Sequence, residues 1–219
     1  MDREKGLRGL PFAREGFAFM GLSLGFSLIL FFLKIPIFPY LGFLFFLFCL
    51  FFFRNPKRMP ISNSSDELIS PADGKVMEIK EMEEDEFIHG KTTRVSIFMS
   101  LTDVHVNRAP CSGIIRKVIH RDGEFALAFK KDIDKENERN YILIESDKEK
   151  ILVVQIAGFL ARRITPYVKD GVEVKKGDPI GIIAFGSRVD IYFPQNYKTM
   201  VSLNNRIKAG MTIIAKRGI

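Results

Sequence analysis

Two long apolar runs dominate the beginning of the chain. Residues 16–33 carry no charged side chain, Lys34 interrupts the pattern, and residues 35–53 are apolar again. Each run is close to the ~20 residues that a helix needs to cross ~30 Å of hydrocarbon. Pro36 and Pro39 fall where a turn between two helices would lie. The pattern predicts a helical hairpin that spans the bilayer or enters one leaflet. A cleaved signal peptide is disfavoured, because no small-residue cleavage site follows the first run.

The rest of the chain alternates short apolar stretches with glycine and proline turns. A polar linker at residues 60–65 precedes candidate strands that are rich in Val and Ile, at residues 76–79, 93–99, 114–120, 141–145 and 151–156. Two more strands are expected on either side of Gly186-Ser187, and the second has the period-two alternation of a half-buried strand at residues 189–193. Between the strands we expect an acidic turn at residues 81–86, a short helix at 124–129 and a polar loop at 130–140.

Two weak internal repeats refine this picture. Residues 70–76 resemble residues 109–115, since a Pro-x-x-Gly turn leads into a strand in both. Residues 175–184 resemble residues 208–215, where a tight glycine turn leads into an apolar strand. Paired hairpins of this kind occur in the barrel-sandwich domains of biotinyl and lipoyl carriers. We therefore predict a mostly β protein, with a barrel-sandwich domain at residues 60–219 after a membrane-attachment hairpin at residues 1–59.

The charge distribution supports membrane attachment. The chain has 33 Lys and Arg against 26 Asp and Glu, a net charge of +7, which favours an anionic membrane surface or a nucleic acid as partner. Basic residues flank the hairpin at both ends, namely Arg8, Arg14, Arg54, Lys57 and Arg58. The positive-inside rule then places the large domain in the cytoplasm at the cell membrane. No nucleic-acid-binding motif is present, so we expect no nucleic-acid partner.

The two cysteines argue against a disulfide. Cys49 lies in the apolar hairpin and Cys111 in a polar stretch of the β-rich domain, so a bond between them is not expected. No spacing of Cys and His is typical of a metal site either. A reducing, cytoplasmic setting is the simplest one for the β-rich domain.

Three residues supply the groups of an activated serine. Ser187 follows Gly186 between two strands, which is ordinary turn material, but the serine could instead be a nucleophile that attacks the carbonyl before it. His105 alternates with apolar residues just before a proline turn, and Asp73 lies in a Pro-Ala-Asp-Gly turn. An acid, a base and a hydroxyl can activate serine in the Ser-His-Asp manner, if the fold brings them together. The Gly-x-Ser-x-Gly signature is absent, which disfavours an α/β-hydrolase. His89 and His120 are interpreted as surface residues.

Four longer motifs stand out in the chain: Phe-Phe-Arg-Asn-Pro-Lys-Arg at residues 52–58, Ser-Pro-Ala-Asp-Gly at 70–74, Asp-Val-His-Val-Asn-Arg-Ala-Pro-x-Ser-Gly at 103–113 and Phe-Gly-Ser-Arg-Val-Asp at 185–190. With these motifs the chain resembles short-form phosphatidylserine decarboxylase proenzymes and their archaeal archaetidylserine counterparts. The resemblance runs from the hairpin to the C-terminus. Residues 103–113 and 185–190 are the most specific parts.

The resemblance implies self-cleavage at the Gly186–Ser187 bond. Ser187 would attack the Gly186 carbonyl, and elimination with loss of ammonia would leave a covalent pyruvate (pyruvoyl) group at residue 187. The large chain, 1–186, and the small chain, 187–219, would stay together as a heterodimer. Asp73 and His105 match family positions linked to maturation and catalysis. Long-form members carry a second histidine three positions after the first, where this chain has Arg108.

The implied chemistry has a physical rationale. Decarboxylation leaves a carbanion, and a pyruvoyl group that forms a Schiff base with the serine headgroup provides the electron sink. His105 is the candidate proton donor, and Arg54, Lys57 and Arg58 could face anionic headgroups at the membrane. The expected product is the ethanolamine phospholipid. Two alternatives remain: a non-enzymatic membrane adaptor with a biotinyl-like domain, although no Met-Lys-Met carrier turn is present, and a membrane-bound serine hydrolase with an uncleaved Ser187. Only the decarboxylase requires a cut before residue 187.

Overall fold

The structure is a computed structural model, and it describes residues 10–123, 137–147, 149–158, 163–184 and 187–218. It divides into two compact units, Met1–Lys57 and Arg58–Ile219. The short helix expected at residues 124–129 and most of the polar loop at 130–140 lie outside the described residues, as does Gly186.

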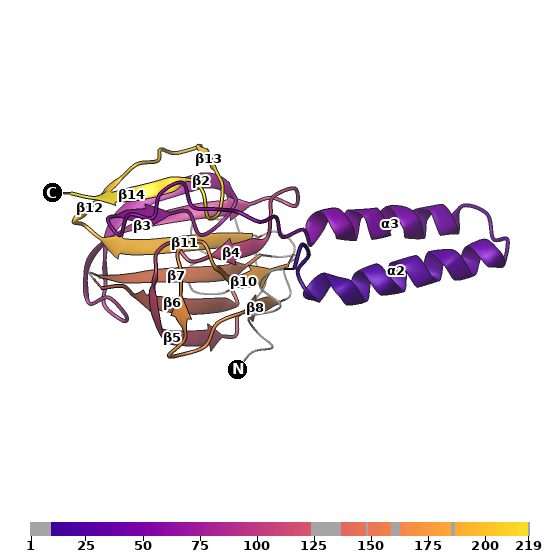
Figure 1. Cartoon of the computed structure of the whole chain (residues 1–219), viewed down its shortest axis with the longest axis horizontal. Coiled ribbons are helices and arrows are strands. Elements are labelled where there is room, and N and C mark those ends of the chain that lie inside the picture. Colours follow the sequence, from indigo (N-terminus) through magenta and orange to yellow (C-terminus); the bar gives the residue numbers. More distant parts are fainter. Residues whose placement is uncertain (1–9, 124–136, 148, 159–162, 185–186, 219) are drawn as a thin grey trace. The chain divides into compact units, whose positions relative to one another are not determined.

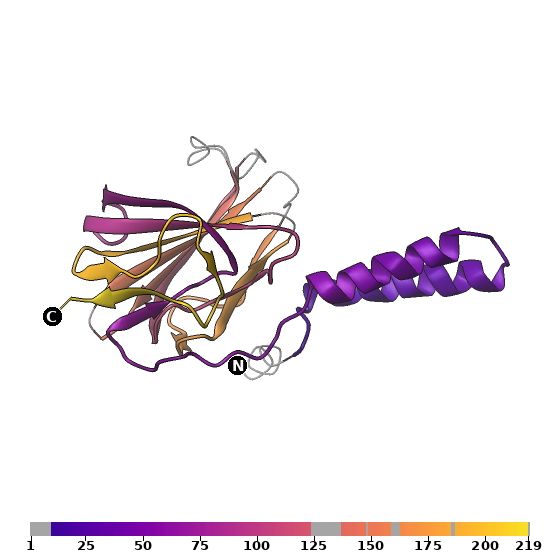
Figure 2. The same ribbon diagram turned by 90° about the horizontal axis from the view of Figure 1, so that it is seen from above.

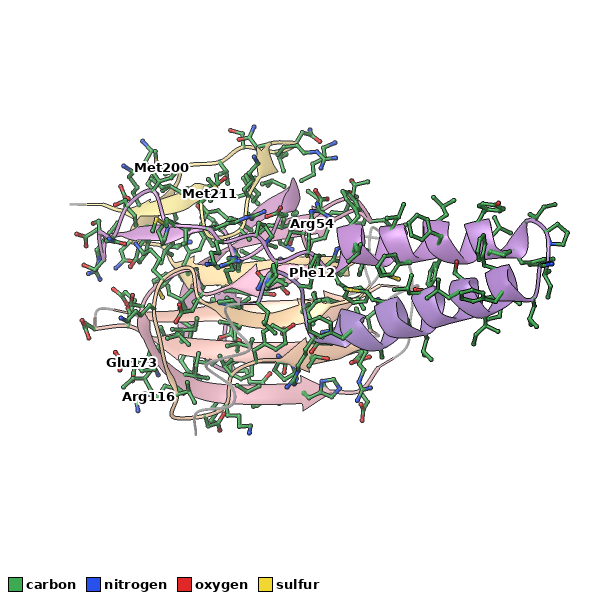
Figure 3. All side chains as sticks on the ribbon, turned by 45° about the vertical axis from the view of Figure 1, so that its right-hand side comes forward. Phe12, Arg54, Arg116, Glu173, Met200 and Met211 are labelled. Carbon is green, nitrogen blue, oxygen red and sulfur yellow. The ribbon has the colours of Figure 1, made fainter. Side chains whose placement is uncertain are left out.

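The first unit is the helical hairpin that the apolar runs predict. Helix α2 spans Glu15–Phe32 and helix α3 spans Phe38–Phe52 (Figure 1). The tight turn between them places Lys34 and Ile37 at positive φ, 56° and 70°. At the base of the hairpin, Phe12 and Arg54 form an isolated antiparallel bridge, and Figure 3 labels both residues. The bridge holds the two ends of the hairpin side by side.

Some of the small residues of the hairpin lie where the two helices meet. Ser27 donates a 2.6 Å hydrogen bond from its hydroxyl to the Pro39 carbonyl on the facing helix. A Cβ added at Gly42 would lie 3.2 Å from the Ser27 Cβ, so a glycine there permits close approach. Large apolar side chains face outward instead, for example Leu22 and Phe32, which are 75% and 78% exposed. Small residues inside and apolar residues outside are the arrangement that a hydrocarbon surrounding favours.

Only α2 is long and apolar enough to cross a membrane among the described helices. Its 18 residues correspond to ~27 Å of helix, whereas α3 has 15 residues and is shorter than a usual span. Length and composition therefore make α2 a weak sign of membrane association, and they leave open whether the hairpin spans the bilayer or enters one leaflet.

The second unit is a β-domain. Its described strands are β1 (Glu67–Ile69), β2 (Gly74–Glu84), β3 (Gly90–Met99), β4 (Val106–Arg108), β5 (Gly113–Arg121), β6 (Arg139–Glu145), β7 (Lys150–Ala157), β8 (Ile164–Pro166), β9 (Glu173–Val174), β10 (Pro179–Ile183), β11 (Ser187–Pro194), β12 (Tyr197–Thr199), β13 (Arg206–Ile207) and β14 (Ile213–Arg217). The largest sheet has the order β13-β2-β3-β11-β7-β6-β5-β9, and two three-stranded sheets, β1-β14-β12 and β4-β10-β8, complete the domain. In Figures 1 and 2 the large sheet is strongly curled, which agrees with the predicted barrel-sandwich class.

The strands follow the alternation of the sequence. On β11, Val189, Ile191 and Phe193 are fully buried in the main core, against Ile97 and Val153 of the neighbouring strands. All of the strands predicted from Val- and Ile-rich stretches are present. The expected acidic turn at residues 81–86 is wrong in part, because β2 continues to Glu84 and pairs with β3 along this length. Likewise the expected loop at 130–140 already belongs to β6 at Arg139.

The sequence repeats correspond to two similar turn pairs. The amide of Gly210 donates to the Ser70 carbonyl at 2.9 Å, and the amide of Gly177 donates to the Ala109 carbonyl at the same distance. Both glycines have positive φ, 74° and 88°, as tight turns require. Each Pro-x-x-Gly turn is therefore held by one glycine turn from the second repeat.

Both cysteines are free, as the sequence predicts, and both are buried, although Cys111 comes from a stretch that reads as polar. Burial raises the pKa of the Cys111 thiol from 9.0 to about 12. Since the thiolate is the reactive form, its fraction near pH 8 falls roughly a thousandfold. In a Cys49→Ser background, we expect Cys111 to react with a disulfide reagent at least 100-fold more slowly in the folded protein than in urea. Rapid reaction of the folded protein would contradict this buried environment.

Candidate active site

Ser187 is the first residue of β11, at the centre of the large sheet. Its backbone pairs with Met99 on β3 and Ala157 on β7. The side chain is fully buried, and its Oγ donates to the Met99 sulfur at 3.4 Å. In Figure 1, β11 lies between β3 and β7, so Ser187 begins an inner strand of the large sheet.

His105 lies just before β4 and is also fully buried. Its Nδ1 is 3.0 Å from the Asp103 carbonyl oxygen. A carbonyl only accepts, so Nδ1 carries the proton and Nε2 is the basic nitrogen of the neutral ring. The Asp103 carboxylate in turn accepts from the Ser100 amide at 2.8 Å and from Arg206 at 3.0 Å. This loop thus fixes both the orientation and the tautomer of His105.

The Met99 sulfur connects the segment that carries His105 with Ser187. Asn107, two residues after His105, donates from its Nδ2 to this sulfur at 3.6 Å, and Ser187 donates to the same atom. The fold therefore brings Asn107 and Ser187, one residue from each of the two most specific motifs, to the same buried methionine.

Asp73 has a different environment from the one that a Ser-His-Asp arrangement would give it. Its carboxylate forms an ion pair with Arg58 and accepts the Ala209 amide at 2.7 Å. In the matching turn at residues 109–115, Ser112 occupies the position of Asp73. Its hydroxyl oxygen accepts the Lys176 amide at 3.0 Å. The two side chains hold their turns in the same way, and the negative charge distinguishes Asp73.

Two arginines surround that charge. The Arg58 side chain, 9% exposed, also donates to the Ala209 carbonyl at 2.8 Å. Arg108 donates to the Gly177 carbonyl at 2.9 Å, and burial, followed by repulsion from Arg58, lowers its pKa to about 10. Arg108 therefore keeps its proton at neutral pH and serves as a fixed cation, not as a base.

The basic residues after the hairpin separate into different environments. Lys57 is exposed, and the Arg54 guanidinium lies 4.0 Å from the centre of the Phe51 ring while donating to the Phe51 carbonyl. Arg58, which the sequence analysis groups with them as a membrane-surface cation, is directed to Asp73 instead. Composition alone could not separate the three.

The interior also holds polar residues that sequence reasoning missed. Gln155 on β7 donates from Nε2 to Asn107 Oδ1 at 2.7 Å and accepts from Asn140 Nδ2 on β6 at 2.9 Å. All three amide side chains are fully buried. The available signal was a glutamine at a core-facing position of the apolar strand at residues 151–157.

Comparison with known proteins shows the family of this chain. The family described as phosphatidylserine decarboxylase matches residues 45–215. The chain belongs to the phosphatidylserine decarboxylase family. A phosphatidylserine decarboxylase proenzyme of Carboxydothermus hydrogenoformans is 46% identical over 177 residues, 80% of this chain and 83% of that protein. The proenzyme of Amoebophilus asiaticus is 44% identical, over 78% of this chain and 76% of its own length. The proenzyme of Desulfotalea psychrophila is 36% identical, over 94% of this chain and 97% of its own length.

Membership of the phosphatidylserine decarboxylase family confirms the resemblance that the motifs carry. The family match includes the second half of α3, both Pro-x-x-Gly turns, His105 and Ser187. The Desulfotalea relative matches over 94% of the chain, so the similarity extends into the hairpin as well.

The ion pair of Asp73 gives a stability prediction. In Asp73→Asn the side chain can still accept the Ala209 amide, but Arg58 loses its counter-charge in a site where both side chains are at most 10% exposed. Removing one partner of a buried ion pair lowers the free energy of unfolding by about 3–5 kcal/mol. We expect a clearly lower melting temperature in detergent. Asp170→Asn is the control, because within the described part of the chain its exposed carboxylate accepts only the Val118 amide. Equal melting temperatures in the two variants would contradict a stabilising role for the pair.

Proposed function

We propose that this protein decarboxylates phosphatidylserine to phosphatidylethanolamine and CO2, with a pyruvoyl group that it makes from Ser187. The proposal rests on family membership together with one observation: a fully buried serine hydroxyl at the family's cleavage motif, joined through Met99 to the segment of His105. The substrate is assigned from what the relatives are named for. The adaptor and hydrolase alternatives are disfavoured by family membership.

Self-cleavage begins with the Ser187 hydroxyl. Its oxygen bonds to the Gly186 carbonyl carbon, the Gly186–Ser187 amide bond breaks, and the hydroxyl proton is transferred to the released nitrogen. The resulting ester is then eliminated: the Ser187 α-proton leaves, and the ester oxygen departs with Gly186 as its carboxylate. Water hydrolyses the nitrogen-bearing product and releases ammonia, so one water enters per group formed. Burial of Ser187 keeps other water from hydrolysing the ester first.

His105 is the proposed proton carrier of both stages. Its Nδ1–H is held by the Asp103 carbonyl, which leaves Nε2 as the atom that takes and returns protons. Arg108 stands where long-form members have their second histidine. With a pKa of about 10 it stays charged, and it cannot replace that histidine as a base at neutral pH. We therefore assign maturation as well as decarboxylation to His105, with Asp73 acting on the site through Arg58 and Arg108.

The surroundings of residue 187 fit a pyruvoyl group. Met99 and Ala157 pair with residue 187 on the two neighbouring strands, so a methyl ketone there would have an apolar partner on each strand. The group would supply a carbonyl for the serine amine of the lipid headgroup and an electron sink for the pair that CO2 leaves behind. The chain's own contribution is to exclude water there and to return a proton from His105.

The two chains are proposed to remain a heterodimer after cleavage. β11 would belong to the small chain, yet it pairs on one side with β3 over Ser187–Pro194 and on the other with β7. β13 and β14 of the same chain pair with β2 and β1 of the large chain. The hairpin would place the enzyme at the cell membrane with this domain in the cytoplasm, and exposed Lys57 would face the anionic headgroups.

The mass of the denatured protein tests the proposal. We expect two chains after purification in detergent, with the smaller one starting at residue 187 and carrying a pyruvoyl group in place of serine. Native gel filtration should keep them together. A single intact chain of 25.0 kDa that is inactive toward phosphatidylserine in anionic vesicles would refute the proposal.

A further inference from the structure

Three buried amides extend from the core to the proposed nucleophile. Asn140 donates to Gln155, Gln155 donates to Asn107, and Asn107 donates to the sulfur of Met99. Ser187 donates to that sulfur from the other side. All five side chains are fully buried, and they come from β3, β4, β6, β7 and β11.

The bonds of this amide chain run in one direction. An amide offers a donor at one end and an acceptor at the other. Because Asn140 donates to the Gln155 oxygen, Gln155 must present its NH2 to Asn107, and Asn107 must then present its own NH2 to the sulfur. Reversing any one amide would set two donors or two acceptors against each other. The three hydrogen-bonded amides thus select one side-chain arrangement around Met99.

Space in the barrel is matched to this arrangement. Asn107 lies opposite Gly181 on β10, and a Cβ at Gly181 would lie 2.8 Å from the Gln155 Nε2. The missing side chain lets β10 approach while Gln155 reaches Asn107. On β7 the core-facing neighbours of Gln155 are Val153 and Ala157, so an apolar residue would suit the sheet equally well. Since core packing does not require the amide, a role in positioning accounts for it.

We infer that Asn107, Gln155 and Asn140 are positioning residues for self-cleavage. They hold Met99 and the His105-bearing segment in register with Ser187. The sulfur is a weak acceptor, so it orients the serine hydroxyl without taking its proton. This inference rests on the proposed function, because it assigns a role in the cleavage of the Gly186–Ser187 bond.

The rate of self-cleavage in the full chain tests the inference. The proenzyme is translated in a cell-free system with phospholipid vesicles, and the large chain is followed over time on denaturing gels. Gln155→Met keeps an unbranched side chain of similar length but removes both hydrogen bonds. We expect it to slow cleavage at least tenfold, since small misplacements of reacting groups have effects of this size or more. Thermal midpoints from protease resistance report the stability of each variant.

Thr92→Val is the matched control. Thr92 is fully buried on β3, and its hydroxyl donates to the Met82 carbonyl at 3.0 Å, away from Ser187. It should cleave at the wild-type rate with a similar change in thermal midpoint. Met99→Leu is a second test, because it removes the sulfur that accepts from Asn107 and Ser187 and keeps an apolar side chain. It should also slow cleavage, and the double variant Gln155→Met/Met99→Leu should be no slower than the slower single variant, as for residues that act as a unit.

The outcomes are distinct. Wild-type cleavage rates in Gln155→Met and Met99→Leu would overturn the inference and leave the proposed function intact. The inference would also be overturned if Thr92→Val slowed cleavage as much as Gln155→Met at a similar loss of thermal midpoint. The slower cleavage would then reflect lower stability and not positioning. A wild-type chain that is never cut would refute the proposed function, and the inference with it.

Discussion

Ser187→Ala should abolish both chain cleavage and decarboxylation. Alanine has no hydroxyl to attack the Gly186 carbonyl, and without the attack no pyruvoyl group can form. The expected product is one chain of 25.0 kDa with no release of CO2 from phosphatidylserine. The substitution removes a single oxygen whose one described hydrogen bond is to a thioether, so we expect the fold to persist. Denaturing mass spectrometry and a CO2-release assay measure the two effects.

Ser202→Ala is the control for this loss. Ser202 is an exposed serine in the same small chain, and it should be cut and remain as active as the wild type. A Ser187→Ala protein that is still cleaved before residue 187 would contradict the mechanism outright. An inactive Ser187→Ala protein whose wild-type parent is itself uncut but hydrolyses esters would instead favour a serine hydrolase.

The outline of the fold could be predicted because it depends on local pattern. Uninterrupted apolar residues at 16–33 and 35–53 determine the hairpin, and Val- and Ile-rich stretches determine the strands. Where the pattern was weaker, the prediction was wrong. Residues 81–84 are charged and resemble a turn, yet pairing with β3 extends β2 through them. Tertiary pairing thus overrode local propensity at an exposed edge.

The site was predictable only in part, because its contacts join distant segments. Ser187 and His105 could be singled out by residue type and motif. The partner of Asp73 could not, since Arg58 belongs to a basic run that reads as a membrane-facing cluster, and only the folded chain directs it to the Pro-Ala-Asp-Gly turn. The hydrogen bond between Gln155 and Asn107 could not be predicted either, because the two residues are 48 positions apart in the sequence. A polar residue on an apolar strand face indicates burial of a polar group but not its partner.

His105→Ala should have the second-largest effect. The ring is fully buried, with Nδ1–H held by the Asp103 carbonyl, so its Nε2 is the one nitrogen able to exchange protons with a reacting group. Loss of a positioned acid–base group lowers rates by about 10²–10⁴-fold. We expect decarboxylation to fall by this amount and self-cleavage to slow with it, because charged Arg108 cannot act as a substitute base. CO2 release, corrected for the fraction of cut chain, separates the two effects.

The control for this prediction is His120→Ala. The His120 side chain is 41% exposed, with its Nε2 3.4 Å from Asp122 and 3.5 Å from Glu138. It should mature and decarboxylate as the wild type does. Full activity in His105→Ala would remove His105 from the site. Normal cleavage with lost decarboxylation would restrict it to the second stage, and self-cleavage would then need another base or a water molecule. Because position 108 is an arginine here, the His105 variant decides whether one imidazole serves both self-cleavage and decarboxylation.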